Sequence, residues 1–317
     1  MKTRPVATLM AFFAMMQAVS VAAETDPLKI PDSDEGVPGS GPLRRTDWFR
    51  GVWRSRRESW LDRTEEQKGS VVFLGDSITE GWGDDFKGAF GKLKVANRGI
   101  RGDTSRGLLL RLKEDVIDLE PRAVVLMIGA NDLAEKSMGE TVFGNVKLIV
   151  EALKAHNPKM PIVLCETFPC APDEYRPVAE IRKINSLYEK MFAGDAQVTL
   201  AKTYSLFAGG DGASLPKYLP DRVHPNAVGY AKWAGAMRPI FAELGFAEDT
   251  TPDPHAWIHF DHLDRQVALF HNFHLNYTDR REGLESRYDV LAILRCGRFC
   301  AGEWSSSKGN LSYEILA

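Results

Sequence analysis

The sequence VVFLGDSITEGW at residues 71–82 joins a short apolar run directly to a polar turn. A run of this length, rich in β-branched residues, is typical of a buried strand. Segments with the helical spacing of apolar residues follow, at about 104–118, 139–156, 174–192 and 226–244. Between and before them stand four more apolar runs: KVAN at 94–97, AVVLMI at 123–128, PIVLC at 161–165 and QVTLA at 197–201.

This alternation of strands and helices predicts an α/β fold. Strands that are apolar along their whole length are typical of a parallel sheet covered by helices on both faces. We therefore expect a three-layer α/β/α sandwich with a central parallel sheet of about five strands. In such a sheet, reactive groups lie at the carboxyl ends of the strands.

The composition is that of a globular protein. The 317 residues are 44% hydrophobic and 26% charged, enough for one core of ordinary size. The formal net charge is −3 and both signs are mixed along the chain, so the sequence has no basic stripe that would match a phosphate backbone. Nucleic acid is therefore not an expected partner.

The first 23 residues have the layout of a secretory signal peptide. Lys2 and Arg4 precede an apolar run at 6–16, and the small residues VAA at 21–23 end the segment. We expect cleavage after Ala23 and a soluble mature protein, secreted or periplasmic, without stable membrane insertion. An uncleaved membrane anchor is the alternative, although the apolar run is short for a bilayer span.

The rest of the chain divides into three parts. Residues 24–67 are expected to be a linker, loose and rich in Pro, Gly, Asp and Ser up to about residue 43, followed by an amphipathic lead-in with tryptophans among charged residues. Residues 68–246 hold the strand and helix pattern. Residues 247–317 break that rhythm, and the sequence leaves open whether they are an appended small element or a tail.

The cysteines and the late histidines allow cross-links or a metal but do not require them. Cys165 and Cys170 form one close pair and Cys296 and Cys300 another; export permits disulfides, and three connectivities stay open. HAWIHFDH at 255–262 spaces three histidines along one possible helix face, which could bind zinc. No carboxylate or fourth ligand is clear, so a solvated or packed segment is the preferred interpretation, and we expect no metal or cofactor.

Three polar segments directly follow predicted strands. Ser77 lies in GDSITEGW, Gly102 in NRGIRGDTS at 97–105, and Asn131 in AVVLMIGAND at 123–132. A glycine lets the backbone approach a ligand closely, and an asparagine can donate its side-chain amide. Each of these residues alone could equally be a helix cap or a turn residue.

The fourth segment, LPDRVHPNAVGYAKW at 219–233, places Asp221 three residues before His224. A carboxylate on the same short loop can hold the far nitrogen of a histidine and fix its tautomer. Pro225 disfavours helical geometry at His224, and Asn226 can cap the helix that follows. This pattern is typical of an acid–base histidine.

Together and in this order, the four segments resemble the four blocks of the SGNH hydrolases, also called the GDSL lipases and esterases. The resemblance covers about residues 70–244, so the SGNH hydrolase domain is expected at 68–246, with a flavodoxin-like sheet. GDSITEGW, NRGIRGDTS and the DxxHPN loop are most similar to members related to platelet-activating-factor acetylhydrolase and to carbohydrate acetylesterases.

The resemblance implies a role for each matched residue. Ser77 would be the nucleophile, His224 the base and Asp221 its orienting partner. The Ser77 and Gly102 backbone amides and the Asn131 side chain would form the oxyanion hole. No G-x-S-x-G elbow surrounds Ser77, which argues against the ordinary α/β-hydrolase arrangement.

The expected activity is serine ester hydrolysis through an acyl-enzyme, on a small-molecule or carbohydrate ester. No long apolar insertion between the blocks could bind a long acyl chain, which favours a short acyl group, acetyl above all. The alternatives are a lysophospholipase or acyl-thioesterase of the same family and a non-catalytic binding module on a hydrolase scaffold. The sequence does not determine the leaving alcohol or the oligomeric state.

Overall fold

The computed structural model describes residues 26–171 and 175–246, together with the backbone of five short strands between 269 and 316. The predicted signal peptide, the HAWIHFDH segment and Cys296 lie outside the described residues. In the part that is described, no helix is long and apolar enough to cross a membrane. The same residues contain no group of three histidines, cysteines or acidic residues that could hold a metal ion.

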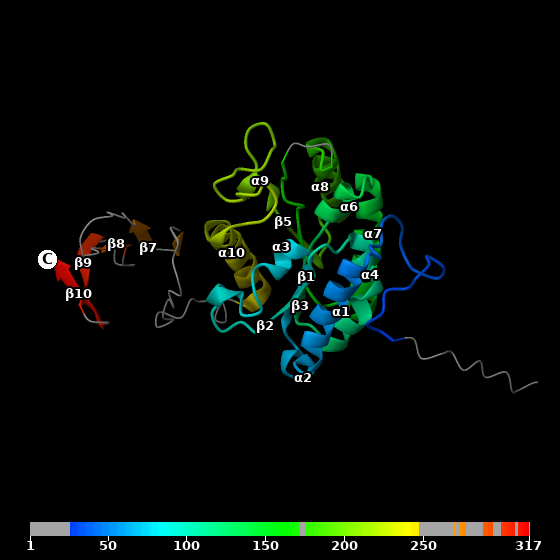
Figure 1. Cartoon of the computed structure of the whole chain (residues 1–317), viewed down its shortest axis with the longest axis horizontal. Helices are drawn as coiled ribbons and strands as arrows, with labels where there is room; N and C mark the ends of the chain where they lie inside the picture. The colour runs from blue at the N-terminus through cyan, green and yellow to red at the C-terminus, as the bar shows by residue number, and fades with distance from the viewer. Residues whose placement is uncertain are drawn as a thin grey trace, which may run out of the picture.

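A five-stranded sheet in the order β2-β1-β3-β4-β5 forms the centre, and every neighbouring pair is parallel (Figure 1). Each strand overlaps one of the predicted apolar runs, with β1 and β2 extending past theirs to Gly75 and Gly99, so the predicted α/β class and parallel sheet are confirmed. The strands are β1 (Val71–Gly75), β2 (Val95–Gly99), β3 (Ala123–Met127), β4 (Ile162–Cys165) and β5 (Val198–Ala201).

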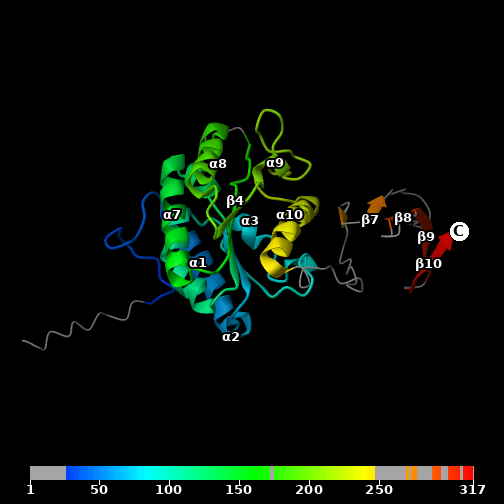
Figure 2. The same ribbon diagram turned by 180° about the vertical axis from the view of Figure 1, so that it is seen from behind.

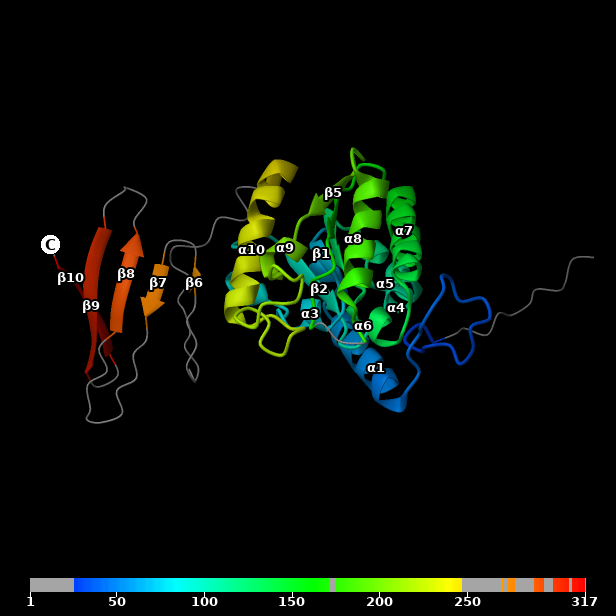
Figure 3. The same cartoon turned by 90° about the horizontal axis from the view of Figure 1, so that it is seen from above.

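Helices cover both faces of this sheet. Figures 2 and 3 show α7 and α8 on one side and α10 on the other. The helices are α1 (Asp47–Leu61), α2 (Thr64–Gln67), α3 (Ser77–Glu80), α4 (Ser105–Leu110), α5 (Leu112–Asp115), α6 (Ala130–Ala134), α7 (Gly139–His156), α8 (Val178–Phe192), α9 (Tyr204–Phe207) and α10 (Ala227–Phe241). Short helical turns occur at Phe86–Gly88, Ile117–Leu119 and Ala242–Phe246.

Successive strand residues alternate between two cores, as the period of two requires. Val72 and Leu74 of β1 belong to the core under α7 and α8. Phe73 points to the opposite core, where Trp82 and Trp233 lie with ring centroids 4.4 Å apart. Both faces of β1 are therefore buried, as expected for a parallel sheet covered on both sides.

The helical segment predicted at 104–118 is divided in the structure into α4, α5 and a short helical turn. The break falls at Arg111, whose backbone has φ −104° and ψ 7°. Apolar spacing alone did not show this break, because the pattern of buried residues continues across it.

The expectation of a loose linker before residue 43 is wrong. Ile30 and Leu43 are buried against Phe49 and Trp53 of α1. The carbonyl of Ile30 also accepts a hydrogen bond from Arg50. The two apolar side chains and the hydrogen bond from Arg50 therefore fix the segment before residue 43 against α1, although its composition is typical of a linker. The amphipathic lead-in forms helix α1, which buries Trp53 and Trp60.

The backbone beyond residue 268 forms a second sheet, antiparallel and ordered β10-β9-β8-β7-β6. The sequence did not predict these strands and left the region undecided. They are β6 (Leu269–Phe270), β7 (Phe273–Asn276), β8 (Tyr288–Ile293), β9 (Phe299–Ser307) and β10 (Asn310–Leu316).

Candidate active site

Three of the predicted site residues follow three adjacent strands. Ser77 is the first residue of α3, directly after β1; Gly102 follows β2; and Asn131 lies in α6, after β3. Because β2, β1 and β3 are neighbours and parallel, their carboxyl ends meet at one edge of the sheet. The fold thus brings three segments of the sequence together at one place.

The fourth segment completes a chain of hydrogen bonds. The Ser77 Oγ lies 2.8 Å from Nε2 of His224. On the other side of the ring, Nδ1 lies 2.6 Å from Oδ2 of Asp221. This is the geometry in which a histidine takes the proton of a hydroxyl while a carboxylate holds its far nitrogen.

The loop that carries Asp221 and His224 is built by its own polar groups. The Oδ1 atom of Asp221 accepts the backbone N–H groups of Val223 and His224, at 3.0 and 2.7 Å. Arg222, which lies between Asp221 and Val223 in the sequence, has a left-handed backbone with φ 71°, a conformation that non-glycine residues rarely adopt. The Asn226 side chain caps α10 by accepting from the Gly229 N–H, as predicted.

Asp221 stays ionised in this loop. Partial burial acts to raise the pKa of its carboxyl, but the hydrogen bonds from the His224 backbone and side chain and from Val223 outweigh burial. The pKa of Asp221 is therefore below its ordinary value, which suits a carboxylate that must stabilise a protonated imidazole.

The three predicted oxyanion donors lie on the turns and helix starts that follow β1, β2 and β3. As the first residue of α3, Ser77 has a backbone N–H without an acceptor inside its own helix. Gly102 has φ +85°, which a glycine adopts without steric cost. The Asn131 side chain is 8% exposed, and its Nδ2 donates to the carbonyl of Asp103 at 2.9 Å and lies 3.4 Å from Oδ2 of Asp76.

Three buried aspartates surround these donors. Asp76 accepts the Ile78 N–H and Asp103 accepts the Thr104 N–H, so both hold backbone amides of the site turns. Asp132 accepts from the Ser105 hydroxyl. Burial raises the pKa of Asp76 and of Asp103 to about 6 and that of Asp132 to about 7, although their hydrogen bonds act in the opposite direction.

Comparison with known proteins identifies the family of this chain. Residues 73–232 match the model of the GDSL-like lipase/acylhydrolase family, and this range contains all five predicted site residues. The chain belongs to the GDSL-like lipase/acylhydrolase family.

Individual relatives agree. A human platelet-activating factor acetylhydrolase IB subunit alpha2 is 25% identical over 225 residues, which cover 70% of this chain and 93% of that protein. A structure from Bacteroides fragilis, assigned as an acylhydrolase, has 30% identity and a TM-score of 0.53, and covers 63% of this chain and 99% of that one. A GDSL-like lipase from Bacteroides thetaiotaomicron has 30% identity and a TM-score of 0.51, covering 59% and 97%.

The family identifies this GDSL-like protein as a carboxylic ester hydrolase, as the sequence predicted. The structure places Ser77, His224 and Asp221 in hydrogen-bond contact and Asn131 beside Asp76 and Asp103. Their individual roles in the reaction are taken up below as a proposal.

The N-terminal segment of this GDSL-like hydrolase contacts the Gly102 turn, which the sequence did not predict. Nη1 of Arg44 donates to the carbonyl of Gly102 at 2.9 Å, and Nε of the same side chain donates to Glu135. A shallow hollow of about 420 Å³ opens beside this contact. It is lined by Pro42, Leu43, Arg44, Arg45, Thr46, Trp48 and Glu135.

Cys165 is a free, buried thiol, and Cys170 is also buried. Burial raises the pKa of the Cys165 thiol to about 12, so it stays protonated and behaves as an apolar core residue.

Proposed function

We propose that this GDSL-like hydrolase removes short acyl groups, acetyl above all, from an alcohol through an acyl-enzyme on Ser77. The observation that carries the proposal is the hydrogen-bonded chain from the Ser77 hydroxyl through His224 to Asp221. A non-catalytic binding module would have no need of this chain.

In the first half of the proposed reaction, Nε2 of His224 takes the hydroxyl proton as Ser77 Oγ bonds to the ester carbonyl carbon. The carbonyl oxygen becomes an oxyanion, which the Ser77 and Gly102 amides and the Asn131 side chain stabilise. The carbon–oxygen bond to the alcohol then breaks, and His224 gives its proton to the leaving alcohol. Asp221 stabilises the transient imidazolium.

In the second half, water replaces the alcohol. His224 takes a proton from this water, whose oxygen bonds to the acyl carbon and forms a second oxyanion. Collapse of that intermediate releases the carboxylic acid and returns the proton to Ser77. The mechanism uses side chains and backbone amides of this chain alone.

Two observations support a short acyl group. The matched human relative is by its name an acetylhydrolase. The sequence between the four site segments contains no long apolar insertion that could cover a long acyl chain. The alternatives within the family, a lysophospholipase or an acyl-thioesterase, would need an apolar surface for the acyl chain from another part of the molecule.

For the leaving alcohol, we propose the hollow beside Gly102. The indole of Trp48 is 58% exposed, and a Cβ placed on Gly102 would lie 3.2 Å from it. An exposed indole face next to the Arg44–Glu135 ion pair offers both stacking and hydrogen bonds to a polyhydroxylated ring such as a sugar.

The first experiment is hydrolysis of p-nitrophenyl esters from two to sixteen carbons by the mature protein, with Ser77→Ala and Ser59→Ala in parallel and a chelator in one arm. We expect a peak at acetyl or propionyl, loss of activity in Ser77→Ala alone, and no effect of the chelator. A peak at long chains would favour the lipid or thioester alternative. Absence of hydrolysis at every length would favour the binding module, and full activity of Ser77→Ala would refute the mechanism.

The alcohol subsite has its own test. Trp48→Ala should raise KM for acetylated oligosaccharides about tenfold, as expected for loss of one stacking contact, and leave turnover of methyl acetate unchanged. Leu61→Ala is the matched control, because Leu61 is equally exposed on the same helix. Equal KM values in both variants would exclude the hollow as the alcohol subsite.

We also propose that residues 1–23 direct export. Expression of the full chain in a bacterial host should yield a protein outside the cytoplasm that begins at Glu24, as measured by N-terminal sequencing of each fraction. An intact N-terminus on membrane-bound protein would instead support the anchor alternative.

A further inference from the structure

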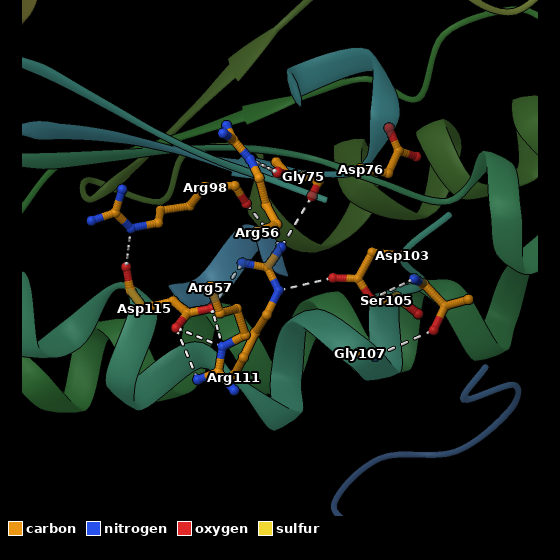
Figure 4. Close-up of polar contacts among 12 residues, drawn as sticks. Arg56, Arg57, Gly75, Asp76, Arg98, Asp103, Ser105, Gly107, Arg111 and Asp115 are labelled. Carbon is orange, nitrogen blue, oxygen red and sulfur yellow. Dashed lines mark hydrogen bonds and ion pairs between the residues drawn. The ribbon is translucent and has the colours of Figure 1, made fainter. Parts of the chain in front are cut away.

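Arg111 lies at the break between α4 and α5 and has no exposed surface. Each of the three nitrogens of its guanidinium donates at least one hydrogen bond (Figure 4). Nε donates to Oδ2 of Asp103 at 2.8 Å, and Nη1 donates to Oδ2 of Asp115 at 3.2 Å. Nη2 donates to two carbonyls, those of Gly75 at 3.1 Å and Arg98 at 2.8 Å.

Two of these acceptor residues, Gly75 and Asp103, lie on the two backbone segments that carry the proposed oxyanion amides. Gly75 is two residues before Ser77, and Asp103 directly follows Gly102. A planar guanidinium fixes several acceptors in one geometry, which an ammonium group cannot do. Arg111 therefore sets the position of the first segment relative to the second.

Asp103 connects Arg111 to the Gly102 turn and to the Asn131 side chain, the proposed oxyanion donors. Its Oδ1 accepts the Thr104 N–H, while its Oδ2 is held by Arg111. Its backbone carbonyl accepts from the Asn131 side chain at 2.9 Å. One residue thus links the guanidinium to both the Gly102 turn and Asn131.

Helix α1 closes this buried network from outside the matched range of 73–232. Nε of Arg57, which is 2% exposed, lies 2.9 Å from both carboxylate oxygens of Asp115. The guanidinium groups of Arg57 and Arg111 also lie over the ring of Trp53, at 5.3 and 5.9 Å from its centroid. Positive and negative groups alternate along this network, in the order Arg57, Asp115, Arg111, Asp103. Each buried charge therefore has an opposite charge beside it, which offsets the free-energy cost of its desolvation.

We infer that Arg111 is a positioning residue for the oxyanion hole and fixes the spacing of the Ser77 and Gly102 amides. The inference rests on the proposed function, because it assigns a role in that reaction. Arg111 does not contact the substrate; it acts through Gly75 and Asp103. Loss of the guanidinium should therefore weaken binding of the transition state more than binding of the ester.

The test compares Arg111→Lys and Arg111→Met with Arg106→Met. Arg106 is a matched control because it is also a buried, ion-paired arginine on α4, but it binds Asp34 and the carbonyls of Pro38 and Gly41. Each variant is titrated with a fluorophosphonate to count its reactive serines. The measured quantities are kcat and KM for p-nitrophenyl acetate and the inhibition constant of a boronic acid, which forms a tetrahedral adduct with the serine.

We expect Arg111→Met to lower kcat per reactive serine about 100-fold, the size typical of a small misplacement of catalytic groups. The KM of this variant for p-nitrophenyl acetate should change little. Its inhibition constant for the boronic acid should rise by a factor similar to the loss of kcat. Arg111→Lys should lie between Arg111→Met and the parent, and it decides the question if Arg111→Met does not fold. Arg106→Met should keep the parent kcat.

The inference is overturned if folded Arg111 variants keep the parent kcat, or if boronic acid affinity is unchanged while only the count of reactive serines falls. That second result would assign Arg111 to stability alone. Failure of the proposed function gives a different result, since Ser77→Ala would then remain active.

Discussion

The two sides of Ser77 are built in opposite ways. On one side, Asp221 and His224 lie three residues apart, with side chains 56% and 44% exposed, and their loop is closed by hydrogen bonds within it. On the other side, Asp103 and Arg111 are fully buried, and Arg111 binds the carbonyl of Gly75, 36 residues away. The proposed acid–base side is thus assembled by a local turn, and the proposed oxyanion side by tertiary contacts.

This difference predicts separable effects of substitution. Exposed, locally bonded groups contribute little to the free energy of unfolding, whereas buried polar groups that lose a partner cost stability. Changes in the Asp221 loop should alter activity alone. Changes among the buried groups should alter activity and stability together.

The largest expected effect is that of His224→Ala. Removing the base should lower kcat by on the order of 10⁴- to 10⁶-fold, as in other serine hydrolases that use a triad. The melting temperature should stay within a degree or two of the parent, since the ring is half-exposed. His156→Ala, an exposed histidine at the end of α7, is the control for both measurements.

Asp221→Asn comes next. The asparagine oxygen can still accept the Val223 and His224 N–H groups, but the negative charge that stabilises the imidazolium is lost. We expect kcat to fall about 100- to 10,000-fold. The loss should be nearer 100-fold, because water that reaches the exposed loop can stabilise part of the imidazolium charge. Asp211→Asn is a matched control, because Asp211 also accepts an N–H two residues on, from Ala213. A large loss of thermal stability in Asp221→Asn would break the comparison.

Asn131→Ala tests the buried side. Removing one oxyanion donor should lower kcat about 100- to 1000-fold with little change in KM. Unlike the loop variants, it should also reduce the free energy of unfolding by about 1–3 kcal/mol, because the Asp103 carbonyl loses its donor. Asn145→Ala is the control: Asn145 is buried and donates to Ser40 and Ser105, so it should lose stability and keep kcat. A fully stable Asn131→Ala would contradict the division between the two sides.

The smallest effect concerns pH. Burial raises the pKa of Asp132 in the folded protein to about 7, above its unfolded value near 3.8, so the folded state binds this proton more tightly. Stability should therefore rise as the pH falls from 8 to 6, by on the order of 1 kcal/mol from this group, or about 3 °C in melting temperature. Asp132→Asn should lose this part of the dependence. Identical slopes in the parent and the variant would show that Asp132 does not titrate in this range.

Much of this protein could be predicted from local sequence. The five strands were predicted because each is a short apolar run, and α7 begins and ends where its spacing indicates. Asp221 and His224 were predicted because both lie on one short loop. Ser77, Gly102 and Asn131 were predicted from their place after strands and from their resemblance to known blocks.

The parts that escaped prediction depend on distant partners. The segment before residue 43 has a composition typical of a linker, yet Ile30 and Leu43 are buried once α1 is in place. Arg111 is one of many arginines in the sequence, and nothing in its neighbours indicates a fully buried group. Its contacts with Gly75, Arg98 and Asp103 exist only when two strand ends and a helix break meet.

By itself, the sequence determined the α/β class, the strand positions and the residues of the acid–base loop, because side-chain periodicity and short-range hydrogen bonds are local properties. Only the tertiary structure decided which groups surround the proposed oxyanion side, because hydrogen bonds among buried charges form only where separate elements meet. The groups that meet here are Arg57, Asp103, Arg111 and Asp115. In this protein, the Asp221–His224 contact of the proposed proton transfer follows from proximity in sequence, and the placement of the proposed oxyanion amides follows from the fold.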